Sequence, residues 1–112
     1  RTKVIGRRIL CVDSCVSTND LAWEEAAGGA AEGTVIFAEE QTAGRGRFGR
    51  RWLAPRGKAL LLSVILRPSI EAERVPLLTV LGALAAAEVA GEKARIRFPN
   101  DVMIGNRKIA GA

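Results

Sequence analysis

The stretch "GRGRFGRRW", residues 44–52, decides the fold class, because its glycine spacing matches the dinucleotide-binding fingerprint and nearly matches a P-loop. Both motifs place a glycine turn at the start of a helix whose N-terminus holds phosphate. Pro55 and Gly57 follow closely here, so no helix is predicted to open. A P-loop also needs Lys and then Ser or Thr after its last glycine, where this chain has Arg50 and Arg51. The sequence therefore predicts a cationic glycine loop belonging to neither fold, with an anion as its partner.

The segments before the loop predict a strand, a helix and a second strand. Residues 4–16 are apolar with polar interruptions, which is typical of a strand. Ser17 or Thr18 can cap a helix that the glycines at 28 and 29 end, and residues 34–40 form a strand entering the loop. The glycine loop therefore joins two strands, which is a further reason to reject a Rossmann turn.

The segments after the loop continue the alternation. The apolar run at residues 59–68 is typical of a buried strand ended by Pro68, and residues 73–91 predict a largely buried helix with a proline in its first turn. Residues 94–98 alternate as a strand, a turn follows, and residues 102–111 predict two short strands around a Gly-Asn turn. We expect one mixed α/β (α+β) unit.

The charge is concentrated in one segment. The chain has 112 residues and a net charge of +5, yet residues 41–70 hold seven basic residues and no acidic one. Thirteen of the seventeen cations are Arg, which suits forked recognition of carboxylate or phosphate. A solvated basic face and a nucleic-acid patch are the alternatives, although the stacking aromatics of a single-strand binder are missing.

The residues that are missing limit the chemistry. The chain has no His and no Tyr, so Ser-His and Cys-His nucleophile pairs cannot be built from it. Cys11 and Cys15 stand alone, which argues against a zinc site, and we interpret both as small buried hydrophobes. No run is long enough to span a bilayer and no signal peptide opens the chain, so we expect a cytoplasmic protein.

Four short stretches together resemble the catalytic domain of biotin protein ligases. They are "STND" (17–20), "EEQTAGRGRFGRRW" (39–52), "RFPNDVMI" (97–104) and "NRKIAG" (106–111), and the resemblance covers essentially the whole chain. It departs where Phe98 replaces the usual Trp and Arg97 the usual Lys. The resemblance implies the biotin/lipoate protein ligase fold, a central mixed sheet flanked by helices that is related to class II aminoacyl-tRNA synthetases.

The resemblance also implies an activity. The family activates biotin with ATP and Mg²⁺ to biotinoyl-5′-adenylate and transfers biotin to a lysine of a biotin carboxyl carrier protein, as in acetyl-CoA carboxylase. An ionised carboxylate is already nucleophilic, so adenylation needs cations rather than a general base. A His-free, Arg-rich loop suits that task.

The resemblance assigns roles residue by residue. Arg50 would contact phosphate, and Trp52 would be an apolar wall near the adenine. The biotin site would comprise Ser17, Thr18, Asn19, Gln41, Gly44, Arg45, Gly46, Arg47 and Lys108. The adenylate site would comprise Arg47, Arg50, Trp52, Asn100 and Lys108, and the catalytic group Lys108, Arg47 and Asp101. The loop around Arg45 to Arg47 would be mobile when empty and ordered when filled.

Each assignment has a plainer alternative. Ser17 to Asn19 can be a helix cap, Trp52 can be core, and Asn100 can form an Asx turn. Lys108 would neutralise charge between the biotin carboxylate and the α-phosphate, or else be a solvated strand lysine. Asn100 and Asp101 would order Mg²⁺ or orient Lys108, and Asp101 is a hypothetical proton acceptor in the transfer step.

The extent of the chain and its partners are further expectations. The chain does not begin with Met and stops where a strand has begun, so we expect residues 1–112 to be the N-terminal part of the ligase catalytic domain, without its remainder and C-terminal domain. DNA would be a partner only if a winged helix-turn-helix lay upstream, and an exposed strand edge would allow a homodimer. The alternatives are lipoate or octanoyl transfer and a nucleic-acid-binding module.

Overall fold

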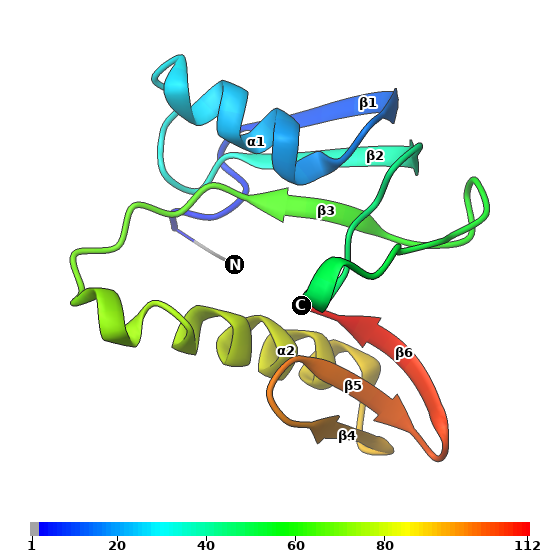
Figure 1. Cartoon of the computed structure of the whole chain (residues 1–112). Coiled ribbons are helices and arrows are strands. Elements are labelled where there is room, and N and C mark those ends of the chain that lie inside the picture. The colour runs from blue at the N-terminus through cyan, green and yellow to red at the C-terminus, as the bar shows by residue number, and fades with distance from the viewer. Residues whose placement is uncertain (1–2) are drawn as a thin grey trace. The chain divides into compact units, whose positions relative to one another are not determined.

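The structure, a computed structural model, describes residues 3–112 and divides into two compact units (Figure 1). We call Arg1–Pro68 the N-terminal unit and Ser69–Ala112 the C-terminal unit. Each unit combines helix and strand, so the predicted mixed α/β character is confirmed. None of the helices within residues 3–112 is long and apolar enough to cross a membrane.

The N-terminal unit is a three-stranded mixed sheet with one helix. Its elements are β1 (Ile9–Cys15), α1 (Thr18–Ala27), β2 (Val35–Gln41), the short 3-10 turn η1 (Arg47–Gly49) and β3 (Leu61–Val64). β1 pairs with β2 in parallel, and β2 pairs with β3 antiparallel. Parallel neighbours need a crossover connection, and α1 provides it. The helix thereby reaches one face of the sheet, where its apolar side chains pack on a core cluster comprising Ala30, Ile36 and Ile65.

The C-terminal unit is a helix followed by an antiparallel sheet. Its elements are the 3-10 turn η2 (Ala72–Arg74), α2 (Leu77–Ala90), β4 (Ala94–Arg97), β5 (Asp101–Ile104) and β6 (Arg107–Gly111). β5 is the central strand, with β4 and β6 on either side of it. The predicted alternation of residues 94–98 and the Gly-Asn turn between two short strands are confirmed.

Burial differs from the sequence prediction in three places. The predicted buried helix begins only at Leu77 and is largely exposed, with Ala83 as its buried residue and Val89 91% exposed. An apolar helix buries only what a neighbouring surface covers, and in this unit one sheet covers one face. The predicted buried strand is four residues long, and Leu62 on it is exposed. Cys11 is exposed on β1 and Cys15 is half-buried, so the interpretation of both as buried hydrophobes is wrong.

Candidate functional site

The N-terminus of α1 is built by the predicted cap. Ser17 has an extended backbone and accepts a hydrogen bond from the Asn19 backbone N–H at 3.2 Å. Such a cap leaves the first turn of the helix with backbone donors that face outward. Ser17 and Thr18 are nevertheless 5% and 4% exposed, so this helix end is enclosed by other residues.

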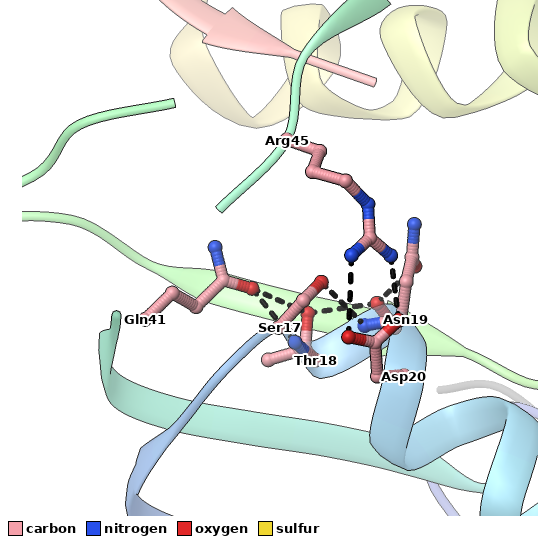
Figure 2. Close-up of polar contacts among 7 residues, drawn as sticks. Ser17, Thr18, Asn19, Asp20, Gln41 and Arg45 are labelled. Carbon is pink, nitrogen blue, oxygen red and sulfur yellow. Dashed lines mark hydrogen bonds and ion pairs between the residues drawn. The ribbon is translucent and has the colours of Figure 1, made fainter. Parts of the chain in front are cut away.

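A chain of hydrogen bonds connects the helix end to two strands (Figure 2). The Gln41 Oε1 atom, at the end of β2, accepts from the Thr18 backbone N–H at 2.8 Å and from the Thr18 hydroxyl at 3.0 Å. The Ser63 hydroxyl, on β3, lies 2.8 Å from the Thr18 hydroxyl and donates to Asn19 Oδ1 at 2.6 Å. Four side chains from three elements are thus fixed relative to one another, and we call Thr18, Asn19, Gln41 and Ser63 the polar network.

The polar network sets the direction of the Gln41 amide. A backbone N–H can only donate, so its 2.8 Å bond identifies the Gln41 atom facing Thr18 as the oxygen. The Gln41 Nε2 group, which carries two protons, is left on the opposite side of the amide. The network therefore presents a hydrogen-bond donor, which suits a ligand with a carbonyl acceptor.

Sequence reasoning missed Ser63. Its signal was present, because Ser63 is the one polar residue within the apolar run of residues 59–66. A buried hydroxyl in such a run needs a partner. The partners are Thr18 and Asn19, which lie more than forty residues away in the sequence.

The glycine loop forms a small hairpin, residues 44–52. The Trp52 backbone N–H donates to the Gly44 carbonyl at 2.8 Å, and the Gly46 N–H donates to the Arg50 carbonyl at 2.7 Å. At the tip, Phe48 has a φ of 59° and is exposed, with the Arg47 guanidinium 4.8 Å from the centre of its ring. The prediction that no α-helix opens after the glycines is confirmed.

Gly44 and Gly46, on the first strand of the hairpin, differ in how much room they leave for a side chain. A Cβ at Gly44 would lie 2.7 Å from Gln41 Nε2 and 2.8 Å from the Trp52 carbonyl oxygen, so no side chain fits there. A Cβ at Gly46 would make an ordinary 3.5 Å contact with the Arg50 carbonyl oxygen. Gly44 is therefore required by the packing of the hairpin against Gln41.

An ion pair joins the hairpin to α1. The Arg45 guanidinium donates to both carboxylate oxygens of Asp20, at 2.6 and 3.2 Å (Figure 2). The hydrogen bonds from Arg45 hold the pKa of the Asp20 carboxyl below its usual range. The sequence analysis included Asp20 in the stretch "STND" but assigned it no partner, because the two residues are 25 positions apart.

Much of the basic segment is internally paired. Arg56 forms ion pairs with Asp13 and Glu40, and Arg67 donates to the Ala26 and Ala30 carbonyls at the end of α1. Arg45, Arg56 and Arg67 are thus engaged within the N-terminal unit. This pairing weakens the nucleic-acid interpretation, which needs a continuous cationic face.

A second group of predicted residues lies in the C-terminal unit. The Lys108 Nζ atom and an Arg97 guanidinium nitrogen each lie 2.8 Å from the Asp101 carboxylate, one at each oxygen. The Asp101 side chain is 15% exposed and that of Lys108 is 35% exposed. The bond from Lys108 first, and that from Arg97 second, hold the pKa of Asp101 below its usual range. Asp101 is therefore an ionised partner for Lys108.

A β-bulge puts Lys108 beside Asp101. Asp101 pairs with Gly111 and Val102 with Ala110, but Met103 pairs with Lys108, so one extra residue, Ile109, lies in β6. Directly opposed residues share a face of the sheet, and so do residues two apart on one strand. Lys108, Met103 and Asp101 are therefore on one face, whereas uninterrupted pairing would put Lys108 on the face of the fully buried Val102.

The predicted Mg²⁺ ligands, Asn100 and Asp101, are neighbours at the start of β5. No group of three or more His, Cys, Asp or Glu suited to a metal lies within residues 3–112. Both oxygens of Asp101 are occupied by cationic side chains. Asp101 therefore pairs with two cations in this structure, and its metal-binding role stays a prediction.

The comparisons with known proteins place these residues in a family. The model of the biotin/lipoate A/B protein ligase family matches residues 12–112. The chain belongs to this family. Its fold class, inferred from the resemblance, is thereby confirmed.

Curated relatives and solved structures of ligases agree with the family match. The chain is 40% identical to the bifunctional ligase/repressor BirA of Bacillus subtilis, covering 99% of this chain and 35% of the relative. It is 34% identical to the biotin--[acetyl-CoA-carboxylase] ligase of Mycobacterium tuberculosis, covering 99% and 47%. The chain thus spans a third to a half of the length of these relatives.

Two solved ligases share the fold. The Leishmania major biotin protein ligase, in complex with biotin, has a TM-score of 0.75 at 28% identity, covering 94% of this chain and 50% of that one. The Aquifex aeolicus biotin protein ligase, in complex with biotin and ATP, has a TM-score of 0.71 at 29% identity, covering 94% and 45%. Biotin is thus bound in both structures, and ATP in the second.

Proposed function

We propose that this chain supplies biotin-binding and adenylate-forming residues of a biotin protein ligase. The whole protein would join biotin to ATP, release pyrophosphate, and pass biotin from the adenylate to a lysine of a biotin carboxyl carrier protein. The observation that carries the proposal is the polar network, in which residues of two separate family motifs, "STND" and "EEQTAGRGRFGRRW", meet at one enclosed helix end. The biotin and ATP bound to related ligases support it.

The polar network suits the ureido ring of biotin. That ring carries a carbonyl oxygen, a strong acceptor, and the amide protons of Gln41 together with the hydroxyl proton of Ser17 supply donors. A site that makes such bonds rejects analogues lacking the acceptor, because its own enclosed donors would then lose their partner. We therefore assign the recognition of biotin to Ser17, Thr18, Asn19 and Gln41.

The hairpin suits the anionic part of the reaction. Arg45 to Arg47 would lie over biotin and the adenylate, Arg50 would contact phosphate, and Trp52, which is half-buried, would flank the adenine. Arginine is suited to this work because its planar fork matches phosphate and carboxylate oxygens. Its charge offsets the repulsion between biotin's carboxylate and the polyphosphate.

Lys108 is proposed as the catalytic cation. During adenylation a carboxylate oxygen of biotin attacks the α-phosphorus and the bond to pyrophosphate breaks, so negative charge develops between the two reactants. The ion pair with Asp101 fixes the direction of the Lys108 ammonium group. The low pKa of Asp101 makes it a poor acceptor for the proton of the target lysine, so this role is disfavoured.

Magnesium is proposed to enter with ATP. Proteins commonly hold Mg²⁺ through one or two oxygen ligands together with substrate phosphates, and it supplies positive charge to them. Asn100 and Asp101 are the proposed ligands, and Asp101 would first have to release a cationic partner. The carrier protein, like Mg²⁺, follows from the proposed activity.

The test is to incubate the chain with biotin, ATP and Mg²⁺ and to detect retained biotinoyl-adenylate by mass spectrometry. We expect the parent chain to form it and the Lys108→Ala variant to form it about 100-fold or more slowly. Lys93→Ala, which removes an exposed lysine from the same unit, is the matched control. Parallel reactions with lipoate and octanoate test the alternative acyl substrates.

Three outcomes would count against the proposal. Adenylate of lipoate or octanoate but not of biotin would favour the other branch of the family. Equal rates in the parent and in Lys108→Ala would remove Lys108 from the chemistry. Failure to bind biotin by calorimetry would show that the resemblance reflects ancestry rather than present function.

A further inference from the structure

We propose that Asp20 is a positioning residue that holds the hairpin of residues 44–52 at the capped end of α1. The inference rests on the proposed function for its consequence in biotin binding, but the contact itself lies wholly within the N-terminal unit. Asp20 follows directly after Thr18 and Asn19 of the polar network. An ion pair from Asp20 to the hairpin therefore ties it to the residues proposed to hold biotin.

The geometry of the pair is suited to holding a direction. Two hydrogen bonds join the guanidinium of Arg45 to the two oxygens of Asp20, at 2.6 and 3.2 Å. A two-point contact fixes the orientation of the guanidinium as well as its distance. A lysine at position 45 could satisfy the charge but could not make this fork.

The pair acts on the hairpin as a whole because Arg45 belongs to its paired part. Arg45 forms an antiparallel bridge with Arg51, and backbone bonds join Gly46 to Arg50 and Gly44 to Trp52. Fixing the position of Arg45 therefore also restricts the opposite strand of the hairpin. Holding one side chain places Arg47 and Arg50, the proposed adenylate contacts, together with it.

The other end of the hairpin's attachment is independent of Asp20. The backbone N–H groups of Thr42 and Ala43 donate to the carbonyls of Cys15 and Val16 at 2.8 and 2.9 Å. These bonds fix the point at which the loop leaves the sheet. Losing Asp20 should therefore let the hairpin swing about this fixed base, leaving the sheet and the polar network in place.

Limited trypsin digestion tests, without any ligand, whether the Asp20–Arg45 ion pair holds the hairpin. Cleavage after Arg45, Arg47, Arg50 and Arg51 requires the hairpin to open, and Asp20 is too distant in sequence to affect trypsin's own preference. We expect Asp20→Asn to speed cleavage at these sites about two- to fivefold, in line with a partly exposed ion pair. Asp20→Glu should recover most of the protection, and Glu24→Gln, an exposed neighbour on α1, should leave the rate unchanged.

The salt dependence of the cleavage rate is a second test of the Asp20–Arg45 ion pair. High ionic strength screens exposed charges, so about 1 M NaCl should bring the cleavage rate of the parent chain up toward that of Asp20→Asn. The variant, which has no pair to screen, should respond less. Equal cleavage of parent and Asp20→Asn at low salt would overturn the inference.

Biotin-binding kinetics then test whether the Asp20–Arg45 ion pair positions the hairpin for biotin binding. We expect Asp20→Asn to dissociate from biotin about two- to fivefold faster, with an unchanged association rate, because closure rather than access is weakened. Faster proteolysis with unchanged biotin kinetics would overturn the positioning role. If the parent chain bound no biotin, the proposed function would fail, and the proteolysis result alone would decide whether Asp20 holds the hairpin.

Discussion

The N-terminal and C-terminal units each gather predicted site residues, but they gather them by different means. In the N-terminal unit, Thr18, Gln41 and Ser63 are neutral and are joined by hydrogen bonds at an enclosed helix end. In the C-terminal unit, Lys108 and Asp101 are charged and partly exposed. Neutral bonds fix where donors point, whereas charges act on a reaction in which charge develops. Under the proposed function, selection of the ligand and stabilisation of the reaction would therefore be separable in this chain.

The largest expected effect separates the two regions directly. Replacing Lys108 with Gln keeps a polar side chain but removes the charge, so the rate of adenylate formation should fall about 100-fold or more. The Kd for biotin should change less than about tenfold, because the N-terminal network is intact. Single-turnover kinetics and calorimetry measure the two quantities, and Lys93→Gln is the control. Equal losses in the rate of adenylate formation and in affinity for biotin would mean that the two regions do not have separate roles.

The next effect concerns the neutral region. Gly44→Ala should displace either Gln41 or Trp52, since the added Cβ would lie 2.7 and 2.8 Å from their atoms. We expect a cost of about 1–3 kcal/mol in stability, as for other overpacked sites, and a weaker Kd for biotin. Gly46→Ala meets an ordinary contact and should be tolerated far better. Thermal unfolding and calorimetry measure stability and the Kd for biotin, and equal values for Gly44→Ala and Gly46→Ala would contradict this prediction.

A third effect tests Ser63. Removing its hydroxyl leaves Asn19 Oδ1 without its 2.6 Å donor and removes a partner of Thr18, which should destabilise the N-terminal unit by about 1–3 kcal/mol. The chain's two tryptophans, Trp23 and Trp52, both belong to this unit, so urea unfolding followed by fluorescence reports on it. Ser69→Ala, at an exposed serine, should leave the unfolding midpoint unchanged. A midpoint for Ser63→Ala equal to the parent's would mean that the network does not support the fold.

The smallest effect is a pH dependence of the charged region. Lys108, then Arg97, hold the folded-state pKa of Asp101 below its unfolded value, so its stabilisation is present above the unfolded pKa. It is lost as the pH falls through the lower, folded pKa. Asp101→Asn should therefore flatten the acid loss of stability below about pH 4, by about 1 kcal/mol or less. Urea unfolding followed by circular dichroism between pH 6 and pH 2.5 measures this, and an unchanged slope would contradict it.

Local rules recovered most of the elements. The Ser17 cap, the glycines that end α1 and the alternation of β4 are properties of a few consecutive residues, and the structure confirms them. Burial was predicted less well. Val89 and Cys11 are exposed because burial depends on which surface faces a residue, and a single stretch of sequence does not specify that surface.

The candidate site was predicted as a set of residues but not as a set of contacts. The motifs named Thr18, Gln41 and Lys108, yet the partners Asp20 and Ser63 were missed because each acts across a long sequence separation. The roles of the site residues, the domain limits, a cytoplasmic location and a homodimer stay predictions.

The bulge in β6 constrains the length of this segment more than its composition. Replacing Ile109 by another strand-forming residue would leave the pairing of the neighbouring positions unchanged. Moving the extra residue from the strand into the turn after Ile104 would instead pair Lys108 with Ile104 and turn it to the opposite face, away from Asp101. We therefore expect a longer turn between Ile104 and Arg107, which would take up the extra residue, to be excluded even where substitutions are accepted.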